Sequence, residues 1–66
     1  MYAVEICRKR QENRARQILG HAGLKADTEI KASPLVLRWN DGYSAKLAFK
    51  LLSKFDVKCR FLFQIV

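Results

Sequence analysis

The stretch SPLVLRWNDGYSAKLAFKLLSKF, residues 33–55, changes its hydrophobic period once, and that change decides the fold. Before the NDG sequence at 40–42, Leu35, Leu37 and Trp39 alternate with outward-facing residues, which predicts a half-buried strand over 35–39. After it, apolar residues recur at steps of three and four, which predicts an amphipathic helix over 44–55 with Phe55 in its buried stripe. NDG is a strong turn signal, and Asp41 or Ser44 is suited to cap the helix.

The rest of the chain repeats these two patterns. Alternation predicts strands over 2–7, 28–32 and 58–65, with Thr28, Ile30 and Ala32 on the inner side of the second one. Steps of three and four predict a helix over 11–22. The Ser33-Pro34 pair predicts a tight connection between the strands at 28–32 and 35–39, because proline removes a backbone donor from the ladder.

The predicted order is strand, helix, strand, strand, helix, strand, which belongs to the α+β class. Two right-handed crossovers would place both helices on one face of a four-stranded antiparallel sheet. This order resembles the ferredoxin-like βαββαβ sandwich, and the resemblance implies the strand order 4-1-3-2. Residues 1–66 are expected to form a single domain. That fold carries many unrelated functions, so it implies none by itself.

A chain of 66 residues has room for one thin core. Eight large apolar side chains are expected to be inaccessible to solvent: Val4, Ile6, Leu19, Trp39, Leu51, Leu52, Phe61 and Phe63. Domains this small often gain stability from a partner subunit, so a homodimer is one expectation. The last strand, an apolar sheet edge, is the surface that favours such pairing.

The charge balance points to an anionic partner. Thirteen Lys and Arg face six Asp and Glu, for a net charge of +7. Such a surface favours nucleic acid, an anionic membrane or an acidic protein. Met1 is followed by Glu5 and a basic run rather than by an apolar stretch, and no segment approaches ~20 apolar residues. We therefore expect a cytoplasmic protein with no membrane partner.

The predicted fold gathers basic residues at one pole, where the first strand ends, the first helix begins, and the second helix gives way to the last strand. These residues, here called the basic pole, are Arg8, Lys9, Arg10, Arg14, Lys54, Lys58 and Arg60, and Lys31 lies near them. Cations at a helix start are unfavourable by ~0.3–1 kcal/mol each, and such violations of local rules cluster at functional sites. Free backbone donors beside cations form a site for a phosphate-sized anion.

The open sheet face is the second candidate surface. Its expected residues are Ala3, Glu5, Cys7, Glu29, Lys31, Val36, Arg38, Arg60, Leu62 and Gln64. The RNA-recognition motif shares the predicted topology and stacks bases on exposed aromatic side chains of its central strands. The equivalent positions here hold Ala, Glu, Cys, Val and Arg, which argues against base stacking. Val36, Arg38, Leu62 and Gln64 instead suit a protein interface.

No residue pattern indicates chemistry. His21 has no cysteine or serine partner nearby in sequence, and two cysteines with one histidine do not form a zinc pattern. Alternation assigns Cys7 and Cys59 to opposite sheet faces, which disfavours a disulfide. We therefore expect neither a cofactor nor a metal and no enzymatic activity. A small nuclease or thiol-dependent enzyme of this shape is the least favoured hypothesis.

The leading hypothesis is a small basic protein that contacts the phosphate backbone of RNA or DNA through the basic pole, without strong sequence specificity. The alternative is a small regulator or inhibitor of another protein, such as a nuclease, whose acidic or nucleic-acid-binding surface complements the pole. The two hypotheses differ in salt dependence and in partner stoichiometry.

Overall fold

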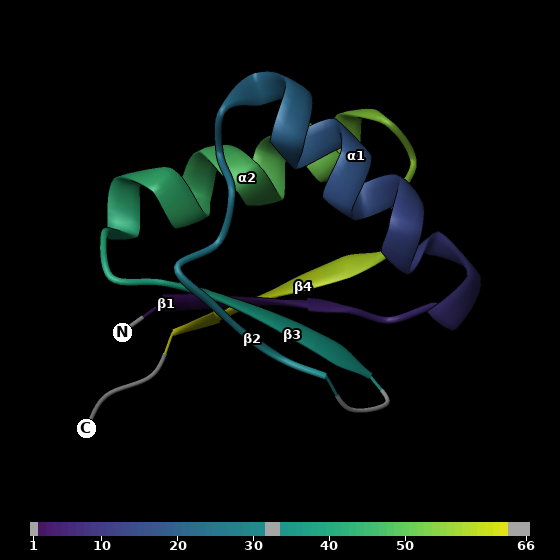
Figure 1. The fold of residues 1–66 in the computed structure, drawn as a ribbon, viewed down its shortest axis with the longest axis horizontal. Coiled ribbons are helices and arrows are strands. Elements are labelled where there is room, and N and C mark those ends of the chain that lie inside the picture. The colour runs from purple at the N-terminus through teal and green to yellow at the C-terminus, as the bar shows by residue number, and fades with distance from the viewer. Residues whose placement is uncertain (1, 32–33, 64–66) are drawn as a thin grey trace.

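The computed structural model describes residues 2–31 and 34–63, and its elements follow the predicted order. They are β1 (Tyr2–Ile6), the 3-10 turn η1 (Lys9–Gln11), α1 (Glu12–Ala22), β2 (Thr28–Ile30), β3 (Leu35–Trp39), α2 (Gly42–Lys54) and β4 (Cys59–Phe63). The strands form one antiparallel sheet in the order β2-β3-β1-β4, which is the predicted 4-1-3-2 order read from the other edge. Both helices cover the same sheet face (Figure 1). The predicted ferredoxin-like α+β arrangement is confirmed.

The core lies between this sheet face and the two helices. Val4, Ile6, Leu19, Trp39 and Leu52 are buried, as predicted. The other buried apolar residues packed with them are Ala15, Leu35, Leu37, Ala45, Ala48 and Val57. Within the described residues, no helix is long and apolar enough to cross a membrane.

Three predicted core residues lie at the margins of the core instead. Leu51 is half-buried and Phe55 is 44% exposed, because both line the outer groove between α1 and α2. Phe61 is half-buried because it sits on the edge strand β4, where its ring stacks against Tyr2 at a centroid distance of 6.4 Å. The predicted strand ends at Ala32, Gln64 and Ile65, and the side chain of Phe63, lie outside what the structure describes.

The predicted facing of β2 is wrong by one residue. Glu29 pairs with the buried Leu37 of β3, and its carboxylate lies 3.1 Å from the Arg16 guanidinium of α1, so it is on the helix side of the sheet. Ile30 pairs with Val36 and is 45% exposed on the open face. A three-residue strand at a sheet edge buries little, so alternation alone cannot determine which of its faces turns inward.

One residue caps the C-terminal end of α1, and another caps the N-terminal end of α2. Gly23 ends α1 in the left-handed conformation at φ 72°, and its N–H and that of Leu24 bond to carbonyl groups of the last turn. Asp41 caps α2, with its carboxylate accepting from the N–H groups of Tyr43 and Ser44 at 3.1 and 3.2 Å. The Ser44 hydroxyl donates to the same carboxylate at 2.9 Å. Of the two predicted caps, the structure therefore selects Asp41.

This cap predicts an acid-sensitive contribution to stability. The hydrogen bond from the Ser44 hydroxyl, helped by the Tyr43 and Ser44 amides, holds the pKa of Asp41 below its ordinary value of 3.8. A lowered pKa in the folded state means that stability is present above the unfolded pKa and is lost as pH falls through the folded pKa. Urea unfolding between about pH 5 and pH 2 should show a shallower loss of stability for Asp41→Asn, which keeps an acceptor but cannot ionise. Identical pH profiles for the variant and the parent would contradict this assignment.

Candidate nucleic-acid interface

Two distant chain segments are tied together at one end of the sheet. The Cys7 N–H donates to the Lys58 carbonyl at 2.9 Å, extending the pairing of β1 with β4. The Gln11 side chain then makes two further bonds: its Nε2 donates to the Asp56 carbonyl at 3.1 Å, and its Oε1 accepts from the Lys58 N–H at 2.9 Å. The β1–α1 junction is therefore fixed against the α2–β4 junction, as Figure 1 shows at the right.

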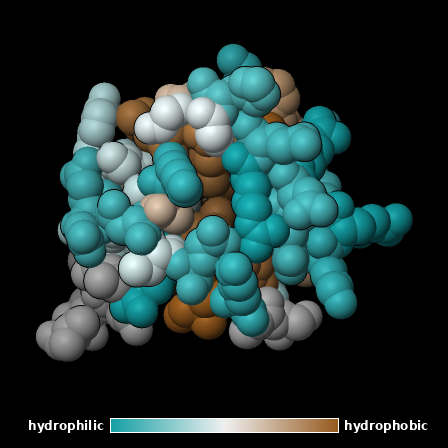
Figure 2. All heavy atoms as spheres, viewed as in Figure 1, coloured by the Kyte–Doolittle hydropathy of each residue, from teal (hydrophilic) through white to brown (hydrophobic). Residues whose placement is uncertain are grey.

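This junction carries most of the predicted basic pole. Six of the pole's seven residues lie at the N-cap of η1, on η1, on the first turn of α1, at the end of α2 or just before β4, and all six are exposed: Arg8, Lys9, Arg10, Arg14, Lys54 and Lys58. Their side chains form no hydrogen bond or ion pair with any part of the chain that the structure describes. Figure 2 shows hydrophilic side chains projecting from this end of the molecule. Unpaired charges of one sign on one end produce a positive potential there.

Arg60 differs from the other six. It lies on β4 opposite Glu5 of β1, and its guanidinium is 3.7 Å from the Glu5 carboxylate. Its side chain keeps 70% exposure on the open sheet face. The structure thus places Arg60 beside the pole, on the adjoining face, where it already has an acidic neighbour.

The start of the first helix bears the predicted anomaly. The helical backbone begins with η1, one turn earlier than α1 itself, and Arg8 occupies the N-cap without a side-chain cap bond. The first turn of η1 has no acidic residue, and Glu12 follows only in α1. Glu12 and Asp56 are the acidic residues next to this junction in sequence, so its cations outnumber its anions. The amide groups of a helix start and these cations favour the same kind of ligand, an anion.

The second candidate surface, the open sheet face, is more apolar than the sequence suggests. Val36, Arg38 and Leu62 are half-buried and lie there as predicted, while Gln64 is outside the described residues. Ile30 lies beside Val36 on this face, whereas Glu29, which was predicted there, lies on the helix side of the sheet. Sequence reasoning missed Ile30 because the alternation of 28–32 fits either face equally well.

The remaining candidates show no catalytic grouping. Cys7 and Cys59 are free thiols, and burial raises the pKa of the Cys59 thiol. His21 lies exposed in the last turn of α1. Among residues 2–31 and 34–63, no group of three His, Cys, Asp or Glu side chains could hold a metal ion.

Comparisons with protein-family models, with curated proteins and with solved structures find no match to this chain.

Proposed function

We propose that this protein binds the phosphate backbone of RNA or DNA through the basic pole and has no enzymatic activity of its own. One observation carries the proposal: six exposed cations, which have no partner among residues 2–31 and 34–63, stand on backbone segments that Gln11 ties together. Cations already paired with acids would lose those pairs on binding, whereas these six have no pair to lose within the described part of the chain. Release of counterions from the nucleic acid then supplies the favourable free energy.

The same surfaces favour binding with little base preference. Phosphate contacts position a protein on nucleic acid but carry no sequence information, which is read at the base edges or by stacking. On the described part of the open face, the strands present aliphatic and charged residues, such as Val36, Arg38 and Leu62, rather than aromatic rings. Discrimination between sequences is therefore expected to be weak.

A salt titration tests the proposal directly. Neutralisation of about four phosphates predicts that log affinity falls with log salt at a slope of roughly −3 to −4. Fluorescence anisotropy with labelled single- and double-stranded oligonucleotides of unrelated sequence should give similar slopes and similar affinities within each class. No binding at low salt would exclude the proposal.

A protein partner is the second candidate function, and Ile30 favours it. A branched apolar side chain that is 45% exposed beside Val36 on an uncovered sheet face suits a protein contact. On this view the protein is a regulator or inhibitor, for example of a nuclease, and the basic pole meets an acidic or nucleic-acid-binding surface. Capture from lysate with and without nuclease treatment separates the two functions: a partner of defined stoichiometry that survives the treatment supports the protein contact.

A further inference from the structure

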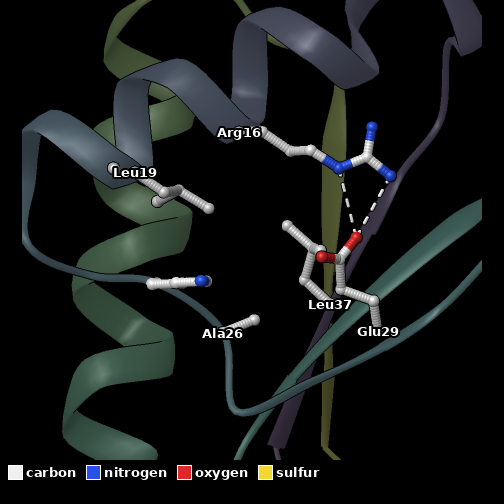
Figure 3. A pocket seen from close by; sticks show the side chains of 7 residues that line it. Arg16, Leu19, Ala26, Glu29 and Leu37 are labelled. Atoms are coloured by element: carbon white, nitrogen blue, oxygen red, sulfur yellow. Dashed lines mark hydrogen bonds and ion pairs between the residues drawn. The ribbon is translucent and has the colours of Figure 1, made fainter.

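A hollow of ≈ 300 Å³ lies between α1, the segment before β2, and the sheet. Figure 3 shows its floor: Leu19 comes from α1, Ala26 from the connecting segment and Leu37 from β3. Leu19 and Leu37 are each only 2% exposed, so the floor is part of the hydrophobic core. A cavity with an apolar floor and a few polar groups at its rim is the usual form of a small-molecule site.

The rim of the hollow carries one positive charge that has no acidic partner among the described residues. At one side of the hollow, Arg16 and Glu29 point toward one another (Figure 3), with the Arg16 Nε and a terminal guanidinium nitrogen each 3.1 Å from a Glu29 oxygen. The other guanidinium nitrogen donates to the Asn13 side chain at 3.3 Å. Lys25 also lines the hollow, is exposed, and has no partner among the described residues. The rim therefore offers one uncompensated positive charge.

Gly20 forms part of the wall, and the fold does not require a glycine there. Glycine is less favourable than alanine inside a helix, because it gives up more backbone freedom on folding. The backbone of Gly20 is not in the left-handed region, and a Cβ at this position would meet nothing within 4 Å. Gly20 borders the hollow, so the lack of a side chain at this position leaves the hollow open.

We propose that this hollow binds a small amphipathic carboxylate. A short aliphatic chain or a single aromatic ring would cover Leu19, Ala26 and Leu37, and the carboxylate would pair with the Lys25 ammonium. The carbonyl groups of Leu19 and Gly20 at the end of α1 already accept from Leu24 and Gly23, at 2.9 and 3.3 Å, so they present little negative charge to the ligand. The site does not use the basic pole and does not depend on the proposed nucleic-acid function.

Three probes of matched size test the ligand chemistry by NMR on the intact ¹⁵N-labelled protein. Hexanoate should shift the amide signals around Gly20, Lys25 and Leu37, with a dissociation constant on the order of 1 mM, because the hollow is small and open. Hexanol should bind more weakly, and hexylammonium should bind most weakly. Equal shifts from all three probes, or hexanoate shifts centred on η1, would overturn the proposal. N-acetyl-leucine, which has a free carboxylate, should bind more tightly than its neutral amide, and equal binding of the two would also overturn the proposal.

Two variants locate the site. Gly20→Leu should abolish hexanoate binding, because the new side chain occupies the hollow, whereas Gly20→Ala should retain most of it. Lys25→Gln should weaken binding by about two- to fivefold, since an exposed charge pair is lost. Lys50→Gln makes the same charge change on the exposed surface of α2 and should leave binding unchanged. Unaltered binding in Lys25→Gln, or an equal loss in Lys50→Gln, would show that the carboxylate is not recognised in this hollow.

Discussion

Trp39→Ala should leave the protein largely unfolded at room temperature. Trp39 is 2% exposed at the end of β3, and its indole N–H donates to the Leu24 carbonyl at 3.1 Å. Truncation of a buried tryptophan costs about 3–5 kcal/mol, and here it also removes the partner of that carbonyl. A domain of this size has a total stability of only about 5 kcal/mol, so little would remain.

Two comparison variants make this test specific. Trp39→Phe keeps an aromatic ring in the core but loses the indole donor, so urea unfolding followed by circular dichroism should show a partial loss of stability. Phe61→Ala should cost less than Trp39→Ala, because Phe61 is only half-buried on the edge strand. A Trp39→Ala protein that melts cooperatively within a few degrees of the parent would show that the core is not organised around this residue.

The simultaneous replacement of Arg8, Lys9 and Arg10 by Ala should reduce nucleic-acid affinity by a factor on the order of 10²–10³ near 0.1 M salt. Each phosphate contact contributes about −0.9 to the slope of log affinity against log salt, so the loss of three contacts should reduce a slope near −3.6 to about −0.9. The reduction should be similar for different sequences. The fold should survive, because all three side chains are exposed and have no partner within the described residues.

A charge-matched pair controls for net charge. Lys9→Ala with Arg10→Ala removes two charges from the pole, and Lys46→Ala with Lys50→Ala removes two from exposed positions of α2. Anisotropy at fixed salt should show a clear loss for the first pair and a small one for the second. Equal losses would mean that the molecule binds through its overall charge. If the parent binds no nucleic acid while the triple variant loses a protein partner, the regulator function replaces the proposed one.

The sequence predicts this fold well where the hydrophobic period is long and unambiguous. The switch at 40–42 places β3 and α2 correctly, and the element order leads to the observed sheet. The errors fall on short or marginal elements. The three residues of β2 fit either face, and their facing is seen only in the structure, where Glu29 pairs with the buried Leu37 and forms an ion pair with Arg16. At Leu51 and Phe55, helical spacing identifies the apolar stripe but not how far the neighbouring helix covers it.

The candidate site likewise has parts that the sequence predicts and parts that it does not. The meeting of η1 with the end of α2 follows from topology alone, so Arg8 and Lys58 could be placed near one another from the sequence. The two hydrogen bonds of Gln11 could not, because they join a side chain to backbone groups 45 and 47 positions away. The hollow beside Gly20 could not be predicted from the sequence either, because a glycine within a helical pattern does not show what space lies beside it.

The two hydrogen bonds of the Gln11 side chain are relevant to the lifetime of the folded state. They span most of the chain, so they form only after the first and last thirds of the molecule have come together and the loop-closure entropy has been overcome. Contacts that form after the folding transition state leave the folding rate nearly unchanged and slow the unfolding rate. If the two Gln11 bonds form after the transition state, replacing Gln11 by Ala should raise the unfolding rate and leave the folding rate nearly unchanged, so the arrangement in which the two basic segments stand side by side would be shorter-lived.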